Sequence, residues 1–266
     1  MKLSRIILVT TLCLSATSVF SHEFWIEPQK FQVKSGETLE IDLKNGQNFV
    51  GGKLSYFQSR FSRFELAQDE TRTPAQGRSG DQPALTTSAD QDGLLVVLHE
   101  TTPSSIKYKD WAKFAKFAAH KGFQNAEADH NSAGWPTENF KESYTRHVKA
   151  LISVGAGEGV DRNYGMETEF VALTNPYSDD FDGNMLVQVF FENTPRQNTQ
   201  IEVFERAPDN TVSITLHKTD ENGIAQVSVK PAHTYLFDAV VLQPYNKDDT
   251  AVWQTLWAAL TFQVPK

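Results

Sequence analysis

The chain has 266 residues and a formal net charge of −8, from 25 Lys and Arg against 33 Asp and Glu. This acidic balance argues against nucleic acid and anionic lipid surfaces as partners. Hydrophobic residues make up only 39% of the chain, but its 18 Phe and 5 Trp supply enough bulky side chains for a core. The composition therefore indicates a globular protein.

The first 21 residues have the pattern of a secretory signal. Lys2 and Arg5 precede an apolar stretch at residues 6–16, and Ser21 suits the position before a cleavage site. We expect a signal peptide over residues 1–21, cleavage after Ser21 and a periplasmic or secreted product without membrane insertion. An uncleaved anchor is the alternative. Cys13, the one cysteine, would leave with the signal, so the mature chain would form no disulfide and no thiolate metal site.

The mature chain begins with β-type segments. Alternating or apolar runs predict strands, and Thr, Ser, Gly and Pro predict an exposed loop over residues 71–92. The predicted strands occupy residues 24–26, 31–33, 38–43, 53–57, 63–66 and 94–99.

The middle of the chain changes to a helical pattern. Trp111, Phe114, Ala115 and Ala118 share one helical face, and Asp110 can cap it, which predicts a helix over residues 111–121. We expect a polar loop at 125–136, a turn or short helix feeding a strand at 140–154, and a strand at 169–173.

From Asn175 onward the sequence indicates evenly spaced strands separated by turns, which is typical of a sandwich. The turn at residues 220–223 predicts a hairpin between strands at 212–218 and 224–229. The expected inward-facing residues are Leu186, Phe190, Val203, Ile214, Val227, Leu236 and Leu260.

The predicted architecture is mainly β, with two β-sandwich-like domains. An N-terminal domain at 22–174 carries a short helical insertion at about 105–147, and an immunoglobulin- or transthyretin-like domain follows at 175–266. The second domain is expected to fold without the first.

Several segments in this order resemble an exported bacterial family known as DUF4198. They are HEFWIEP at 22–28, ESYTRHVKAL at 142–151, NPY at 175–177, TDENG at 219–223 and WQTLWAALTF at 253–262. Members are often labelled as periplasmic components of nickel or cobalt uptake. The resemblance implies a β-rich periplasmic protein with a transthyretin-like or carboxypeptidase-regulatory-like C-terminal sandwich, and it implies no catalytic residues. Some relatives carry His where this chain has Gln47.

His22 is the strongest candidate ligand for a metal. After cleavage behind Ser21, its α-amine and imidazole could chelate one ion, and nitrogen donors suit Cu(II) and Ni(II). We expect His99 or His147 as the further ligand, while His120 and His130 flank the polar loop. The alternative is that His22 simply begins a strand.

The predicted function is non-enzymatic binding of a Ni, Co or Cu ion in the periplasm, in support of uptake or homeostasis, with a membrane metal transporter as partner. Two alternatives stay open: a metal-free module that binds protein or glycan, and a copper-dependent redox enzyme built on His22. No Gly-x-Ser-x-Gly or His-Glu-x-x-His motif points to another chemistry.

Overall fold

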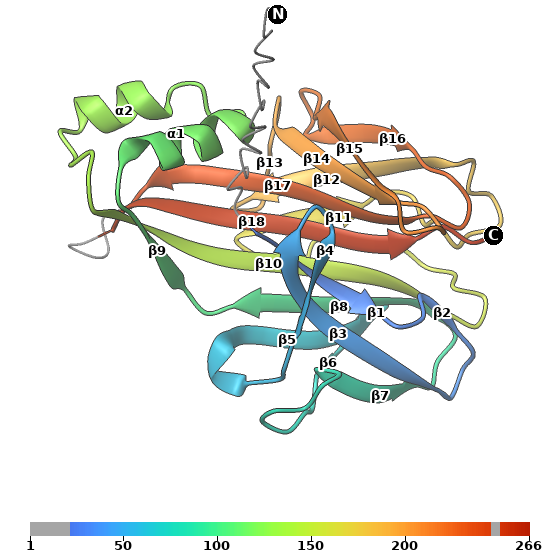
Figure 1. Cartoon of the computed structure of the whole chain (residues 1–266). Helices are drawn as coiled ribbons and strands as arrows, with labels where there is room; N and C mark the ends of the chain where they lie inside the picture. The colour runs from blue at the N-terminus through green and yellow to red at the C-terminus, as the bar shows by residue number, and fades with distance from the viewer. Residues whose placement is uncertain (1–21, 246–250) are drawn as a thin grey trace, which may run out of the picture.

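The computed structural model describes residues 22–245 and 251–266 (Figure 1). The signal predicted at residues 1–21, with Cys13, lies outside these residues. Within the described ranges, the helices are too short or too polar to cross a bilayer.

A ten-stranded central sheet runs through the molecule (Figure 1). Its order is β15-β14-β17-β18-β10-β8-β5-β6, and β2 and β9 also pair with β10. The strands are β2 (Gln32–Val33), β5 (Phe61–Gln68), β6 (Thr71–Pro74), β8 (Gly93–Thr101), β9 (Ser104–Tyr108), β10 (Phe140–Val154), β14 (Gln200–Arg206), β15 (Val212–Lys218), β17 (Thr234–Pro244) and β18 (Ala251–Gln263). The 3-10 turn η1 (Gln58–Arg60) leads into β5.

The centre of this sheet is the parallel pair β10 and β18. The register runs from Glu142 opposite Trp253 to Ala150 opposite Thr261, so the last strand of the chain pairs with a strand from its middle. The sheet is therefore continuous across residue 175. That the segment at 175–266 folds without the segment at 22–174 stays a prediction.

Two smaller sheets cover the central sheet. The N-terminal sheet contains β1 (Glu23–Pro28), β3 (Glu37–Gln47), β4 (Val50–Leu54) and β7 (Leu85–Ala89). The C-terminal sheet contains β11 (Thr168–Ala172), β12 (Asn184–Phe191), β13 (Thr194–Pro195) and β16 (Ile224–Ser228). Because side chains alternate along a strand, β10 contributes side chains to the core on both faces of the central sheet. Ile152 packs with the N-terminal sheet, and Leu151 packs with the C-terminal sheet. The mainly β, two-sandwich fold class is confirmed.

Two helices cover one end of the central sheet on the same face as the N-terminal sheet (Figure 1). The predicted helix is confirmed as α1 (Trp111–His120), where Asp110 accepts the backbone N–H of Lys113 at 3.2 Å. The polar loop predicted next is wrong in part, because residues Ala126–Ser132 form α2, which buries Ala126 and His130 against aromatic side chains.

Three further expectations are corrected. Residues 140–154 form one uninterrupted strand without a leading turn or helix, because β9 and β18 pair along its first half. The hairpin predicted around 220–223 is absent: β15 pairs with β14 and β16 with β12, so this turn carries the chain from one sheet to another. Ile214, expected in the core, is exposed because β15 ends the central sheet. Leu186 and Phe190 are only half-buried, because the alternate residues of β12 face the core.

Candidate functional site

A row of buried charges crosses the central sheet between the N-terminal sheet and the helices. We call it the seam cluster; it consists of Glu23, Lys121, Arg146, Glu202 and Asp238. Glu202 and Asp238 are opposite each other on β14 and β17, and both face the layer that holds the helices and the N-terminal sheet. Five charged groups so deeply buried need strong mutual pairing to be tolerated.

Lys121 neutralises the acidic end of the cluster. Its Nζ lies 2.7 Å from Asp238 Oδ2, contacts Glu202, and sits 4.7 Å from the centre of the Trp257 ring. Burial by itself lowers the pKa of Lys121, but Asp238 and Glu202 more than offset this effect and raise it. Burial raises the pKa of Asp238, although Lys121 opposes that change. The end of α1 is thus fixed to the sheet through charge.

Arg146 occupies the other end of the cluster, on β10. Its guanidinium stacks on Trp257 at 3.9 Å and lies 5.2 Å from the ring of Tyr144. Nη2 donates to the backbone carbonyl of His22 at 2.8 Å. Among the described residues, Nε and Nη1 have no hydrogen-bond partner. Burial lowers the pKa of Arg146 from a value so high that the group stays charged.

The first residues of the predicted mature chain are held at this place. His22 is exposed, whereas Glu23 is 4% exposed and belongs to the cluster. Burial, followed by repulsion from Asp238, raises the pKa of Glu23 to about 7. The chain is therefore anchored immediately after the predicted cleavage point, with the His22 side chain in solvent.

A second buried carboxyl group, Glu142, lies two side chains along the same face of β10. It accepts hydrogen bonds from Tyr108 at 2.7 Å and from Thr255, and Trp257 in turn donates to Thr255 at 2.9 Å. Burial raises the pKa of Glu142 despite these bonds. The side chain is held firmly by its neighbours.

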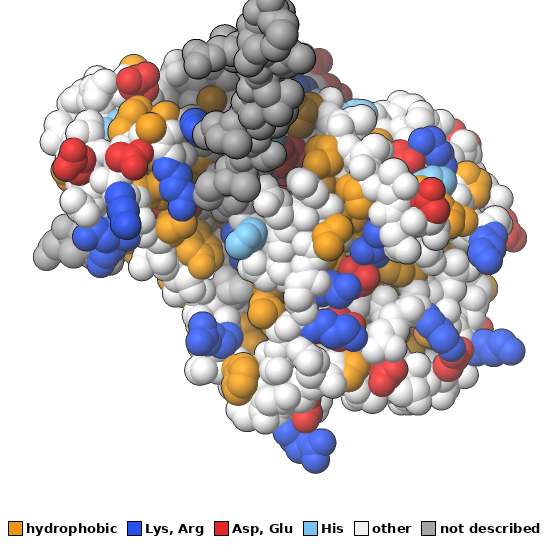
Figure 2. Space-filling view, viewed as in Figure 1, with side chains coloured by type: hydrophobic (Ala, Val, Ile, Leu, Met, Phe, Trp, Pro, Cys, Tyr) orange, Lys and Arg blue, Asp and Glu red, His pale blue; other side chains and the backbone are white. Residues whose placement is uncertain are grey.

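Two cavities flank Arg146. The first, of about 300 Å³, is lined by His22, Tyr108, Lys113 and Glu142 among others. The second, of about 340 Å³, is lined by His99 and by a mixture of apolar and polar side chains. Both contain Asn45, Tyr144 and Arg146 in their walls. On the face shown in Figure 2, acidic and basic side chains are interspersed, so neither sign dominates it.

The structure brings two of the three predicted histidines to this region. His22 lines the first cavity and His99 the second. His99 is 2% exposed and packs against Phe24, Phe61 and Phe64, with ring centres 5.1 to 5.3 Å apart. Burial lowers the pKa of His99 to about 3, which keeps the ring neutral, and its Nδ1 has no partner in the described part of the chain.

His147 is directed to the other face of the central sheet. It alternates with Arg146 along β10 and shares the side of Leu151, which packs against the C-terminal sheet. Burial lowers its pKa to about 4. His147 and His99 therefore cannot face one ion from the same cavity, and the geometry separates His147 from His22.

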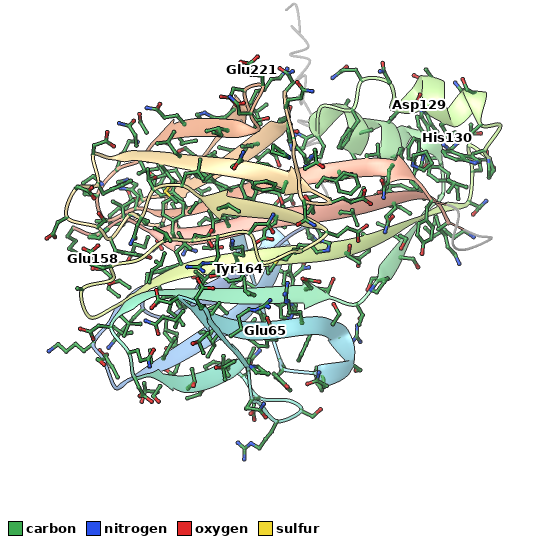
Figure 3. The ribbon with its side chains drawn as sticks, turned by 180° about the vertical axis from the view of Figure 1, so that it is seen from behind. Glu65, Asp129, His130, Glu158, Tyr164 and Glu221 are labelled. Carbon is green, nitrogen blue, oxygen red and sulfur yellow. The ribbon has the colours of Figure 1, made fainter. Side chains whose placement is uncertain are left out.

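The remaining histidines of the middle segment have structural contacts. His120 contacts Glu202 in the seam cluster. His130 lies with the helices at one end of the molecule (Figure 3), where its Nδ1 is 3.1 Å from the indole nitrogen of Trp253 and its Nε2 is 3.1 Å from the Pro136 carbonyl. Across residues 22–245 and 251–266, no three or more His, Cys, Asp or Glu side chains are grouped to hold a metal ion.

Sequence reasoning missed Arg146 and the acidic residues of the seam cluster. It selected His147 from the segment at 142–151, but the residue one position earlier faces the cavities. The hydropathy pattern could not show which side chains face the cavities, because the charged residues lie in strands that are buried on both faces.

The fold and the site define a β-sandwich protein with ligand-sized cavities beside a buried charge cluster. The chain belongs to the family described as "Domain of unknown function (DUF4198)", whose match covers residues 19–243. No curated protein matches it. Among solved structures it is similar to the "D0-D1 domain of Intimin", with 13% identity, a TM-score of 0.21, and coverage of 90% of this chain and 97% of that one.

Proposed function

We propose that this protein is a non-enzymatic, extracytoplasmic binding protein for a transition-metal ion of the Ni, Co or Cu type, supporting metal uptake or homeostasis. The observation that carries the proposal is the place of His22, exposed in the wall of a cavity and immediately before the anchored Glu23. A membrane metal transporter is the expected partner.

The geometry around His22 suits a chelate at the chain terminus. If residues 1–21 are removed, the new α-amine and the imidazole belong to one residue, and the Arg146 contact to the His22 carbonyl holds that residue's backbone. A preorganised donor pair loses less entropy on binding than a mobile one. Asn45 and Tyr144 offer further oxygen or nitrogen atoms in the same cavity.

The donor set is a partial fit for a metal ion. His22 contributes an exposed imidazole, and His99 contributes an unpaired buried one in the adjoining cavity. His147 is left out of the proposed site because it faces the opposite side of the sheet. The amine would therefore have to act as a ligand, which makes the proposal sensitive to the chain terminus.

The sharpest test compares two proteins that differ by one residue ahead of His22. We expect the chain that begins at His22 to bind Ni(II) or Cu(II) at least about tenfold more tightly than a chain with one added alanine, because the extension converts the His22 amine into an amide and moves the primary amine to the alanine. Isothermal titration supplies the affinity, and ligand-field absorption of the bound ion reports nitrogen coordination.

The matched side-chain variant is His22→Ala, which keeps the amine and removes the imidazole. Both changes should weaken binding. Equal affinity of the native and extended chains would contradict a terminal chelate. Absence of binding by either chain would favour a metal-free binding module, whereas oxidase or peroxygenase turnover with copper would favour the redox enzyme.

A further inference from the structure

The second cavity beside Arg146 has the composition of a small-molecule site. Its volume is about 340 Å³, and its wall is mixed. One part is apolar and consists of Phe24, Leu43, Leu54, Phe57 and Phe61, and the rest carries polar or charged side chains that include His99 and Arg146. Small-ligand sites are commonly apolar clefts of a few hundred Å³ in which a few polar groups fix the orientation of the ligand. Leu54 and Phe57 are 41% and 43% exposed, so apolar side chains reach the surface there.

Two buried polar side chains in this wall have nitrogen atoms without a partner among the described residues. Arg146 is 6% exposed, and its Nε and Nη1 donate to no described residue. His99 is 2% exposed, and its Nδ1 is likewise unpaired. A buried polar group without a hydrogen bond destabilises the fold, because its hydration is lost without compensation. Two such residues in one cavity wall indicate that a ligand completes their hydrogen bonding.

The neighbouring acids do not supply those bonds. Asp238 is engaged by Lys121, and the two oxygens of Glu142 accept from Tyr108 and Thr255. Together with Glu23, these carboxylates offset the charge of Arg146 at a distance, and they leave its Nε and Nη1 without an acceptor among the described residues. A ligand with a single negative charge fits this balance better than a doubly charged phosphate, because each added charge meets repulsion from the same acids.

We propose that this cavity binds a small organic carboxylate with an apolar or aromatic body, whose carboxylate pairs with Arg146 while the body packs on the phenylalanines and against His99. Planar guanidinium groups suit carboxylates, and these hydrogen bonds are stronger than neutral ones. Entry of the carboxylate displaces the half-buried Tyr144 ring, which shares this wall with Arg146. The proposal does not rest on metal binding at His22.

The test uses metal-free protein that begins at His22, with chelator present, and titrates phenylacetate, phenylacetamide and inorganic phosphate by calorimetry. Phenylacetate should bind saturably. The neutral amide, which has the same shape, should bind about tenfold more weakly or worse, because it cannot form a charge-assisted bond. This pair of ligands needs no mutation, so it stays decisive even where a variant fails to fold.

Two arginine variants locate the charge. Arg146→Lys keeps the positive charge and loses the planar N–H groups, so phenylacetate affinity should fall about tenfold or more. Arg78→Gln removes an exposed arginine that does not line this cavity and should leave the affinity unchanged. Melting temperatures confirm that both variants are folded.

Three outcomes would overturn the proposal. The first is no saturable binding of phenylacetate. The second is equal affinity for the acid and the amide. The third is a phenylacetate affinity of Arg146→Lys that equals that of the wild type. Phosphate binding as tight as that of phenylacetate would assign the cavity to inorganic oxyanions and also reject the organic carboxylate.

Discussion

At the scale of single residues, the seam cluster shows how charge is tolerated inside a β-sandwich. Lys121 has two carboxylate partners and an aromatic face, so its burial is compensated. Arg146 has an aromatic face but only one hydrogen bond from its guanidinium, to the His22 carbonyl. Among the described residues, Arg146 is therefore the cation of the cluster that has unpaired N–H groups.

His147 should make stability depend on pH. Its pKa is lowered from 6.5 to about 4 by burial, so the unfolded chain takes up a proton below pH 6.5 that the folded chain refuses. The stability present above pH 6.5 is therefore lost as the pH falls to 4. A shift of this size corresponds to about 3 kcal/mol.

The measurement is urea unfolding, followed by tryptophan fluorescence, of the wild type and His147→Gln between pH 7 and pH 4. Between pH 7 and pH 4, the free energy of unfolding of the variant should fall by about 3 kcal/mol less than that of the wild type, because the variant lacks the His147 imidazole. The other titrating groups, His99 included, contribute equally in both proteins. Parallel pH profiles for the two proteins would show that His147 is protonated without cost in the fold.

At the scale of elements, the segment from β10 to β11 is attached to the sheet by Lys149. The Lys149 Nζ is 2.7 Å from Asp161, 3.0 Å from Glu169, and within 3.0 Å of the Arg162 and Phe170 carbonyls. Tyr164, labelled in Figure 3, places its ring 4.9 Å from the same nitrogen. One side chain thus satisfies acceptors at residues 161 and 162 of the connection and at 169 and 170 of β11.

Replacing this lysine should release the connection. We expect Lys149→Met to lower the free energy of unfolding by about 3–5 kcal/mol, because Asp161 and Glu169 would stay buried without a cation. Amide hydrogen exchange should accelerate over residues 161–172 before the rest of the sheet.

The matched control is Lys30→Met, which breaks an exposed ion pair with Glu37 and should cost under about 1 kcal/mol. Adding Asp161→Asn to Lys149→Met should recover part of the loss. A Lys149→Met protein as stable as the wild type would mean that the two acids are protonated and carry no charge.

At the scale of the whole molecule, the two predicted domains share a sheet and a core. β18 pairs with β10 over ten residues, and the core below the C-terminal sheet includes Leu94, Val96 and Leu151 from before residue 175. β11 also precedes the predicted boundary and yet pairs with β12. Separating the segments would expose both a strand edge and a buried surface.

We therefore expect the protein starting at His22 to unfold in one cooperative transition. Calorimetric and van't Hoff enthalpies should agree, and circular dichroism and fluorescence should give the same midpoint. Because β18 and the core facing it would lose their partners, a fragment of residues 175–266 should be far less stable than the whole chain. Two separate transitions, or a fragment as stable as the intact protein, would instead establish the boundary predicted from the sequence.

The sequence by itself determined the local structure where one signal dominated. Asp110 and the spacing of Trp111, Phe114 and Ala118 defined α1, and alternation and apolar runs indicated the mainly β class, although β6 and β7 lie in the loop predicted at 71–92. The candidate site includes His22 and residues of the segment at 142–151, because both line the cavities.

Tertiary structure decided which strands are neighbours and which side of each strand faces the cavities. Asp220 to Gly223 has the chemistry of a hairpin turn, yet the flanking strands join different sheets, where β15 pairs with β14 and β16 pairs with β12. Arg146 and His147 are adjacent in the chain and face opposite layers. A strand buried on both faces carries no hydropathy signal for its orientation, so this pairing of residues with cavities follows only from the packing of the sheets.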